Sequence, residues 1–249
     1  MELQGRVALV TGAASGFGRG IAELFVEQGA KVAVVDLNGA GAETVAKSLG
    51  DAAIAVQCDV ADAASVKNAA QQTLDAFGRI DIVINNAGIS HKNRPMLEVD
   101  EAEFDRVFAV NVKSIYLMTH ATLPRMRQQG GGVVINVGST AGIRPRPGLT
   151  WYNASKGAVN LMSKSMAVEL APDKIRVNCI APVIGETALL ETFMGVPDTP
   201  ENRARFIATI PLGRMSRADD IAQAALYLAS DRAAMVTGTV LEVDGGRCI

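Results

Sequence analysis

The most constraining feature of this chain is a regular alternation of short apolar runs with longer stretches of helical spacing. Residues 6–11, 31–35, 53–57 and 80–84 are runs of strand length, and each is followed by a segment with a helical apolar period. Strands that are apolar at nearly every position belong to a parallel sheet covered on both faces. The alternation therefore predicts an α/β fold of Rossmann type, with a doubly wound parallel sheet and helices on both faces.

The same pattern continues to the end of the chain and gives about seven strands. Further strands are expected at 133–137, 175–180 and 239–243. Helices are expected over 17–28, 41–49, 62–77, 100–129, 151–170 and 219–229. Asp62 and Asp100 are suited to begin their helices, and Gly29, Gly50 and Gly78 to end theirs. No linker, repeat or low-complexity segment interrupts the pattern, so residues 1–249 are expected to form a single domain.

One stretch, about 183–211, fits neither a strand nor a long helix. From Pro182 to Pro211 the chain holds four of its nine prolines, which predicts irregular structure with short helices. A long irregular insertion in a compact domain is usually functional. We therefore expect a small lid over a substrate site.

Composition argues against several other classes of protein. The formal net charge of −2 provides no basic surface for nucleic acid, and no apolar run reaches the length of a membrane span. Cys58, Cys179 and Cys248 are odd in number and far apart, which fits free thiols in a reducing cytoplasm. With only His91 and His120, no metal site is expected. The N-terminus lacks the layout of a signal peptide, so a cytoplasmic protein is predicted.

A glycine-rich turn follows the first expected strand and opens the first helix. Its relevant members are Gly12, Ser15, Gly16, Phe17 and Gly18. Backbone N–H groups and the positive end of a helix can hold a pyrophosphate at such a turn. Asp36 ends the second strand, near the spacing of about 20 residues expected for a carboxylate that binds the adenosine ribose hydroxyls. Together these features predict a dinucleotide site.

Asp36 also bears on the choice of cofactor. A ribose 2′-phosphate would bring like charges within about 4 Å of its carboxylate. This repulsion costs roughly 1 kcal/mol in water and up to about 4 kcal/mol at an effective dielectric of 20. The next residues, Leu37 and Asn38, include no arginine to offset it. We therefore expect NAD and a disfavoured NADP, although Asp36 would also suit a turn or a helix cap.

Tyr152 and Lys156 lie four residues apart in an expected helix, with Ser139 thirteen residues before the tyrosine. Positions i and i+4 share one face of a helix. A nearby ammonium favours the phenolate, so the pKa of Tyr152 is expected to fall from about 10 toward neutrality. A tyrosine of that kind can exchange protons at neutral pH. Alone, the spacing would equally fit a solvated pair.

The turn spacing Gly-x-x-x-Gly-x-Gly resembles that of the short-chain dehydrogenase/reductase family, and the resemblance runs from about Leu3 to Arg247. The other matching residues are Asp59-Val60, Asn85-Asn86-Ala87-Gly88, Asn111, Ser139, Tyr152 with Lys156, and Asp244-Gly245-Gly246. The resemblance implies that Asp59, Val60, Asn86, Ala87 and Gly88 contact the cofactor. Asn85 and Asn86 would also suit hydrogen bonds to backbone between strands.

The chain departs from the family after the sixth expected strand. It reads Pro182-Val183-Ile184-Gly185-Glu186-Thr187, where the family usually has glycine at 183 and an apolar residue at 185. Thr187 keeps its place. We expect Pro182, Ile184, Gly185 and Thr187 still to contact the nicotinamide carboxamide.

The resemblance implies reversible hydride transfer between NAD and a carbonyl/alcohol pair. Tyr152 would exchange the alcohol proton. Lys156 would bind the nicotinamide ribose and keep Tyr152 acidic, helped by the positive nicotinamide ring of the oxidised cofactor. Ser139 would hydrogen-bond the substrate oxygen. Asn111 would hold a water that links Lys156 to solvent. The cofactor would carry the hydride, and the protein would supply position and electrostatics.

Substrate contacts are expected from loops at the carboxyl ends of the strands. The candidates are Ser90, His91 and Arg94, the segment 143–151, and the segment 189–194. Leu189, Leu190, Phe193 and Met194 would form an apolar wall or pack the lid. Arg94, Arg144 and Arg146 would bind a substrate anion or lie exposed on loops.

Three functions remain open from the sequence. The first is an NAD-dependent dehydrogenase of a secondary alcohol, polyol, sugar or hydroxy acid. The second is a 3-oxoacyl-[acyl-carrier-protein] reductase, against which Asp36 argues because that subgroup mostly uses NADPH. The third is a non-enzymatic dinucleotide sensor, against which the presence of both Tyr152 and Lys156 argues.

The resemblance also implies a homotetramer. Helices 101–129 and 151–170 would form a four-helix contact between subunits, and the last strand would make a second contact. The residues that would suit the packed face, or equally the core, are Ala121, Ala158, Met162, Met166 and Ala167.

Overall fold

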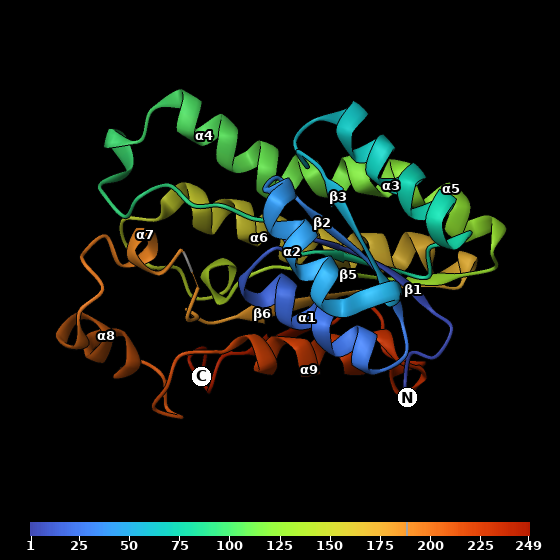
Figure 1. The fold of residues 1–249 in the computed structure, drawn as a ribbon. Helices are drawn as coiled ribbons and strands as arrows, with labels where there is room; N and C mark the ends of the chain where they lie inside the picture. The colour runs from blue at the N-terminus through green and yellow to red at the C-terminus, as the bar shows by residue number, and fades with distance from the viewer. Residues whose placement is uncertain (188) are drawn as a thin grey trace.

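The computed structural model describes residues 1–187 and 189–249; residue 188, within the expected lid, lies outside the described residues. Its centre is a seven-stranded sheet in the order β3-β2-β1-β4-β5-β6-β7, with every neighbouring pair parallel. The predicted fold class is confirmed. Figure 1 shows helices packed on both faces of this sheet.

The strands and helices lie close to the expected segments. The strands are β1 (Val7–Thr11), β2 (Lys31–Asp36), β3 (Ala53–Gln57), β4 (Ile82–Asn85), β5 (Gly132–Val137), β6 (Ile175–Pro182) and β7 (Val240–Val243). The α-helices are α1 (Gly16–Glu27), α2 (Gly39–Leu49), α3 (Ala63–Phe77), α4 (Glu101–Phe108), α5 (Ser114–Gln128), α6 (Thr150–Leu170), α7 (Leu190–Met194), α8 (Pro200–Ile207) and α9 (Ala218–Ala229). No helix in the described part of the chain is long and apolar enough to cross a membrane.

The strand order reverses between β1 and β4. From β1 the chain winds outward through β2 and β3, and then returns to build β4 to β7 on the other side. Loops that leave adjacent strands in opposite directions open a crevice at the carboxyl ends of those strands. The topology therefore places a binding site beyond the ends of β1 and β4.

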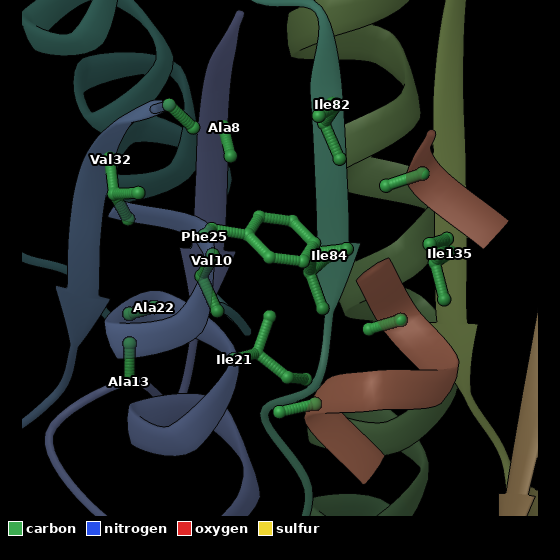
Figure 2. Close-up of a cluster of buried hydrophobic side chains, with 14 of the residues drawn as sticks. Ala8, Val10, Ala13, Ile21, Ala22, Phe25, Val32, Ile82, Ile84 and Ile135 are labelled. Carbon is green, nitrogen blue, oxygen red and sulfur yellow. The ribbon is translucent and has the colours of Figure 1, made fainter. Parts of the chain in front are cut away.

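Two hydrophobic clusters cover the two faces of the sheet. One joins α1, α2 and α9 to the sheet, and Figure 2 shows Phe25 and Ile21 of α1 against Val10 and Ile84 of the central strands. The other joins α3, α5 and α6 to the opposite face. Phe25 is fully buried. The sheet that carries the site is therefore held rigidly from both sides.

The expected helix 100–129 is not one continuous α-helix, which corrects the sequence-based prediction. It begins as predicted, because the Asp100 side chain accepts a hydrogen bond from the backbone N–H of Glu103 at 2.8 Å. A π-helical turn, η3 (Ala109–Lys113), then separates α4 from α5. Such turns displace one residue from the helical register and are frequent at functional sites. Here the displaced turn carries Asn111.

The expected lid contains two short helices, α7 and α8, which lie together at one end of the molecule (Figure 1). Leu190 and Met194 of α7 are buried against Met215. These two side chains therefore pack inside the lid. Of the apolar wall predicted at 189–194, Leu189 and Phe193 face the cavity.

Candidate active site

A cavity of about 520 Å³ opens where the topology places the crevice. Most of the predicted cofactor and catalytic residues line it: Gly12, Ser15, Gly16, Phe17, Asp36, Asp59, Val60, Asn86, Ala87, Gly88, Ser139, Tyr152, Lys156, Pro182, Ile184, Gly185 and Thr187. Gly18 and Asn111 lie behind its wall. Residues at or beyond the carboxyl ends of β1 to β6 thus meet Tyr152 and Lys156 of α6 around one space.

The glycine-rich turn has a shape that only glycine permits. Gly12 and Gly16 have φ values of +64° and +55°, a region that side chains rarely adopt. A Cβ on Gly18 would lie 2.2 Å from the carbonyl oxygen of Gly12. A Cβ on Gly16 would instead project across the cavity, 3.5 Å from Thr187. The open cradle at the N-terminus of α1 therefore fits the pyrophosphate of a dinucleotide.

Asp36 connects this turn to the end of β2. Its two carboxylate oxygens accept hydrogen bonds from the backbone N–H groups of Ala14 and Asn38, each at 2.9 Å. A carboxylate has about four acceptor sites, so both oxygens keep capacity toward the cavity. Asp36 therefore holds a structural turn and also presents negative charge where a ribose would bind.

Asn86 and Thr11 clamp the two strands that flank the switch point. The Asn86 side chain donates to the carbonyl of Thr11 at 2.8 Å, and the Thr11 hydroxyl accepts from the backbone of Asn86 and Ala87. Asn85 is turned away and donates to Asn136 on β5 at 2.8 Å. The paired asparagines therefore fix the cavity floor through structural bonds.

The departure at Pro182–Thr187 has a physical cause. A Cβ on Gly185 would lie 2.4 Å from the Phe17 ring, so glycine at 185 makes room for the phenylalanine of the glycine-rich turn. Ser216 holds the same segment from behind: its hydroxyl donates to Val183, and its backbone N–H donates to Ile184 at 3.2 Å. The segment therefore lines the cavity despite its unusual sequence.

Tyr152, Ser139 and Lys156 lie at the other end of the cavity. Burial raises the pKa of Tyr152 to about 12, and its interaction with the Ser139 hydroxyl only partly offsets this. Burial likewise lowers the pKa of Lys156 to about 8. The Lys156 ammonium donates to the carbonyl of Val137 at 2.8 Å and lies 6.0 Å from the centre of the Tyr152 ring.

The expected fall in the pKa of Tyr152 is therefore wrong for the protein alone. Desolvation opposes the phenolate, and Lys156 is directed at a backbone carbonyl rather than at the phenol. The pKa of Tyr152 can fall below its ordinary value only if a positive charge from outside this chain lies near the phenol. An oxidised nicotinamide ring is a charge of the required sign.

Asn111 lies beside the site, and both of its amide donors and one acceptor position of its oxygen are occupied. Its amide donates to the carbonyl of Ile89 at 2.9 Å and to the Ser155 hydroxyl at 3.0 Å, while its oxygen accepts from Ile89 N–H at 2.8 Å. Gly88 separates it from Lys156: a Cβ on Gly88 would lie 3.3 Å from both Asn111 Oδ1 and Lys156 Nζ. The π-helical turn thus aims Asn111 at the floor beneath Lys156.

The substrate end of the cavity is mostly apolar. Leu149, Leu189 and Phe193 line it together with Arg146. The Phe193 ring from α7 packs on Tyr152 with ring centres 4.9 Å apart. This contact brings the lid directly over the tyrosine.

Several residues expected to meet the substrate do not line this cavity. Ser90, His91 and Ile143 lie outside its lining, and so do Arg94 and Arg144. Arg94 forms an ion pair with Glu103 of α4, and Arg144 donates to the carbonyl of Arg247. Of the three candidate anion-binding arginines, only Arg146 reaches the cavity.

Asn93 is a residue that sequence analysis missed. Its side chain donates to the carbonyls of Pro147 and Phe193, at 3.1 and 3.3 Å, and so joins the 146–148 loop to α7. Gly148 and Gly195 make room for it, because a Cβ there would lie 2.1 and 2.8 Å from Asn93 atoms. No local sequence signal marks it, since its partners are 54 and 100 residues away.

One acidic cluster lies away from the cavity. Glu242, Asp244 and Cys248 bring potential ligand atoms within 4.8 Å of one another. Asp244 already accepts hydrogen bonds from the backbone of Gly246 and Cys248, each at 2.8 Å. These hydrogen bonds form a turn near the C-terminus, and the turn explains why the three side chains lie close together.

Comparisons with known proteins agree with this geometry. A family model described as enoyl-(acyl carrier protein) reductase matches residues 12–247. The chain is 48% identical to 4-formylbenzenesulfonate dehydrogenase of Comamonas testosteroni, over 100% of both chains. A solved 3-ketoacyl-(acyl-carrier-protein) reductase from Brucella melitensis, complexed with NADH, is 49% identical with a TM-score of 0.94, covering 99% of this chain and 100% of its own.

A second solved structure shows the same fold at lower identity. It is a putative short-chain dehydrogenase/reductase from Burkholderia xenovorans. It is 37% identical, covers 99% of this chain and 97% of its own, and has a TM-score of 0.92. The match thus extends over essentially the whole of each protein.

Proposed function

The chain belongs to the short-chain dehydrogenase/reductase family of oxidoreductases, and from this premise we propose that it is an NAD-dependent dehydrogenase acting on a carbonyl/alcohol pair. The observation that carries the proposal is a single cavity with Asp36 and the glycine cradle at one end and Tyr152 with Ser139 at the other. A dinucleotide held at the first end extends toward a proton donor and acceptor at the second.

Each residue of the tetrad has a distinct role in this proposal. In oxidation the bound nicotinamide would accept the hydride from the alcohol carbon. Tyr152 would take the hydroxyl proton, and Ser139 would hydrogen-bond the same oxygen as the carbonyl forms. Lys156 would bind the nicotinamide ribose, and the positively charged ring of the oxidised cofactor would favour the Tyr152 phenolate. Asn111 would position the floor beneath Lys156.

The arrangement of Asp36 supports NAD over NADP. Its carboxylate is fixed in direction by Ala14 and Asn38. A 2′-phosphate near it would meet a like charge that cannot turn away, at a cost of roughly 1 to 4 kcal/mol. The NADH bound in the Brucella melitensis structure adds support.

The substrate end supports a small organic substrate with an apolar body. Leu149, Leu189 and Phe193 provide apolar contact beside Tyr152. A secondary alcohol, polyol, sugar or hydroxy acid is a candidate, and so is an aromatic aldehyde, as in the name of the Comamonas testosteroni relative. Cys58 and Cys179 are buried free thiols, which supports a reducing cytoplasm.

A second candidate is reduction of a 3-oxoacyl group on an acyl carrier protein. The name of the Brucella melitensis structure favours it. Activity with a 3-oxoacyl-carrier-protein that exceeds activity with every small carbonyl would replace the first candidate with this one.

The proposal is tested by measuring NADH absorbance with a panel of alcohols and aldehydes. Wild type should prefer NAD to NADP by about tenfold to a thousandfold. Tyr152→Phe should lower kcat by about a hundredfold or more, because the proton donor is lost. NADH binding, measured by fluorescence, should survive in this variant. Near-normal turnover by Tyr152→Phe would sink the assignment of Tyr152.

A further inference from the structure

Arg146 is a cation in the wall of the cavity with an unfilled hydrogen-bonding position. Its guanidinium stacks over the Phe206 ring of α8, with Cζ 5.0 Å from the ring centre. Its Nη2 atom is buried and has no hydrogen-bond partner within the described ranges 1–187 and 189–249. The Asn153 side chain donates to its carbonyl at 2.8 Å and fixes the backbone of the loop. The side chain is thus held against the lid rather than left free in solvent.

The charges around Arg146 are positive. Burial, and after it the nearby positive charges of Arg247 and Arg144, lower its pKa to about 10. It therefore remains protonated at neutral pH. Arg144 donates to the carbonyl of Arg247, which brings the three cations together, and two buried nitrogens of Arg247 also have no partner in the described part of the chain.

A buried cation without a counter-ion is unfavourable unless another group pairs with it. The fork of a guanidinium matches carboxylate and sulfonate groups, which accept two parallel hydrogen bonds. An anion that enters this cavity would therefore gain both charge and hydrogen bonds. A neutral carboxamide of the same size would gain a weaker hydrogen bond through its carbonyl oxygen and no attraction between opposite charges.

From this geometry we infer that the substrate carries a terminal carboxylate or sulfonate, and that Arg146 binds it. The inference rests on the proposed function, because Tyr152 and Ser139 define the reacting end. The substrate carbonyl would lie at Tyr152, its apolar body against Leu149 and Phe193, and its anionic end at Arg146. Arg146 is then a specificity-determining residue.

The test compares three aldehydes that differ mainly in one group: 4-formylbenzoate, 4-formylbenzenesulfonate and the neutral 4-formylbenzamide. Reduction consumes one aldehyde, one NADH and one proton, and yields one alcohol and one NAD. Wild type should prefer the two anions in kcat/KM by about tenfold or more. Arg146→Gln should lower kcat/KM for the anions by about 10- to 100-fold, mostly through KM, because hydrogen bonds to a charged group are lost.

Two further variants serve as controls. Arg205→Gln removes the same charge from an exposed position of α8 and should leave all three aldehydes unchanged. Arg146→Lys keeps the charge but loses the fork, so it should lower kcat/KM for the anions about 3- to 10-fold and leave the amide unchanged. If Arg146→Gln fails to fold, the Arg146→Lys variant still tests the inference. An equal loss for the neutral and anionic aldehydes would overturn the inference.

A binding measurement separates this inference from the proposed function. Benzenesulfonate, titrated calorimetrically into the protein with NADH, should bind wild type at least tenfold more tightly than Arg146→Gln. If that difference is found but no aldehyde or alcohol is turned over, the anion site stands and the proposed function fails. If turnover occurs but benzenesulfonate binds both proteins equally, the proposed function stands and the anion site is refuted.

Discussion

At the scale of the residue, Lys156 is a buried charge whose titration should appear in the stability of the protein. It is 5% exposed, and burial lowers its pKa to about 8, against 10.5 for a free lysine. Between these values the unfolded chain binds more protons than the folded one. The contribution of Lys156 to the free energy of unfolding should therefore rise with pH, by about 1 to 3 kcal/mol between about pH 7.5 and 9.5. Urea unfolding at both pH values measures it.

Lys156→Met is the matched variant, because it keeps the length of the side chain without the charge. The raised pKa values of Cys58, Cys179 and Cys248 act in the opposite direction in both proteins. The effects of Cys58 and Cys248 cancel when the two proteins are compared. Lys156 lowers the pKa of Cys179, so its removal raises that pKa and adds to the difference in the same direction. From about pH 7.5 to 9.5, the change in the free energy of unfolding should be less positive in the variant than in wild type, by about 1 to 3 kcal/mol. The same pH dependence in both proteins would mean that Lys156 is not desolvated as the structure shows.

The same residue scale marks a limit of sequence analysis. Helical spacing placed Tyr152 and Lys156 on one helix, and both line the cavity on α6. Spacing says nothing about burial, which comes from Leu149, Ala141 and Phe193 packed around the tyrosine. For that reason the direction of the Tyr152 pKa was predicted wrongly. The match between Phe17 and Gly185 was missed in the same way, because it joins residues far apart in the chain.

At the scale of the element, prediction succeeded where the signals were local. Strand β3 lies at the expected residues, and α3 begins after Asp62, whose side chain accepts from Ser65 N–H at 2.7 Å, and ends at Gly78. The π-helical turn was missed because its apolar period differs from that of an α-helix by only one residue. Short helices were expected in the lid, but their bounds were not predicted because they depend on contacts with distant loops.

Substitution of Asn93 tests how the 146–148 loop and α7 are held together at the substrate site. Asn93→Ala removes both hydrogen bonds to the 146–148 loop and α7, each contributing about 0.5 to 1.5 kcal/mol. The loops that carry Arg146 and Phe193 should then loosen. KM for the carbonyl substrate should rise about 3- to 30-fold, while KM for NAD stays within about twofold. Steady-state kinetics with each substrate varied in turn measures both.

The control for Asn93 is another asparagine of the lid region. The Asn202 side chain on α8 donates to the carbonyl of Pro197 at 2.9 Å. Asn202→Ala removes a bond of the same kind without touching the 146–148 loop, so neither KM should change. Equal increases in both KM values of Asn93→Ala would show general destabilisation instead of a positioning role.

At the scale of the whole molecule, the alternation of strands and helices predicted a doubly wound parallel sheet, and the site lies at the carboxyl ends of its strands, where it was expected. The surface between subunits stays a prediction. For Met162, Met166 and Ala167 the sequence left a subunit contact and the core equally open; Ala167 is buried in the core, and Met162 and Met166 are partly buried against it. Core and interface side chains have the same composition, so the sequence could not separate them.

The structure points to other side chains for the subunit contact. Tyr116 on α5 and Leu161 and Val168 on α6 are 58%, 66% and 80% exposed. Large apolar side chains gathered on neighbouring helices are typical of an interface. Near the last strand, Met235 and Ile249 are also exposed, at 98% and 96%. We therefore propose that wild type is a homotetramer in which α5 and α6 form one of two contacts.

Charging the α6 surface should divide this assembly. The double substitution Leu161→Glu and Val168→Glu places like charges opposite their symmetry copies in an isologous contact, and should convert the tetramer to a dimer held by the second contact. Light scattering measures the mass. Asn68→Glu with Gln72→Glu adds the same charge to exposed positions of α3 on the same side of the sheet, and should leave the tetramer intact. A monomeric wild type, or a tetramer that survives the α6 charges, would show that this helix pair is not a subunit contact.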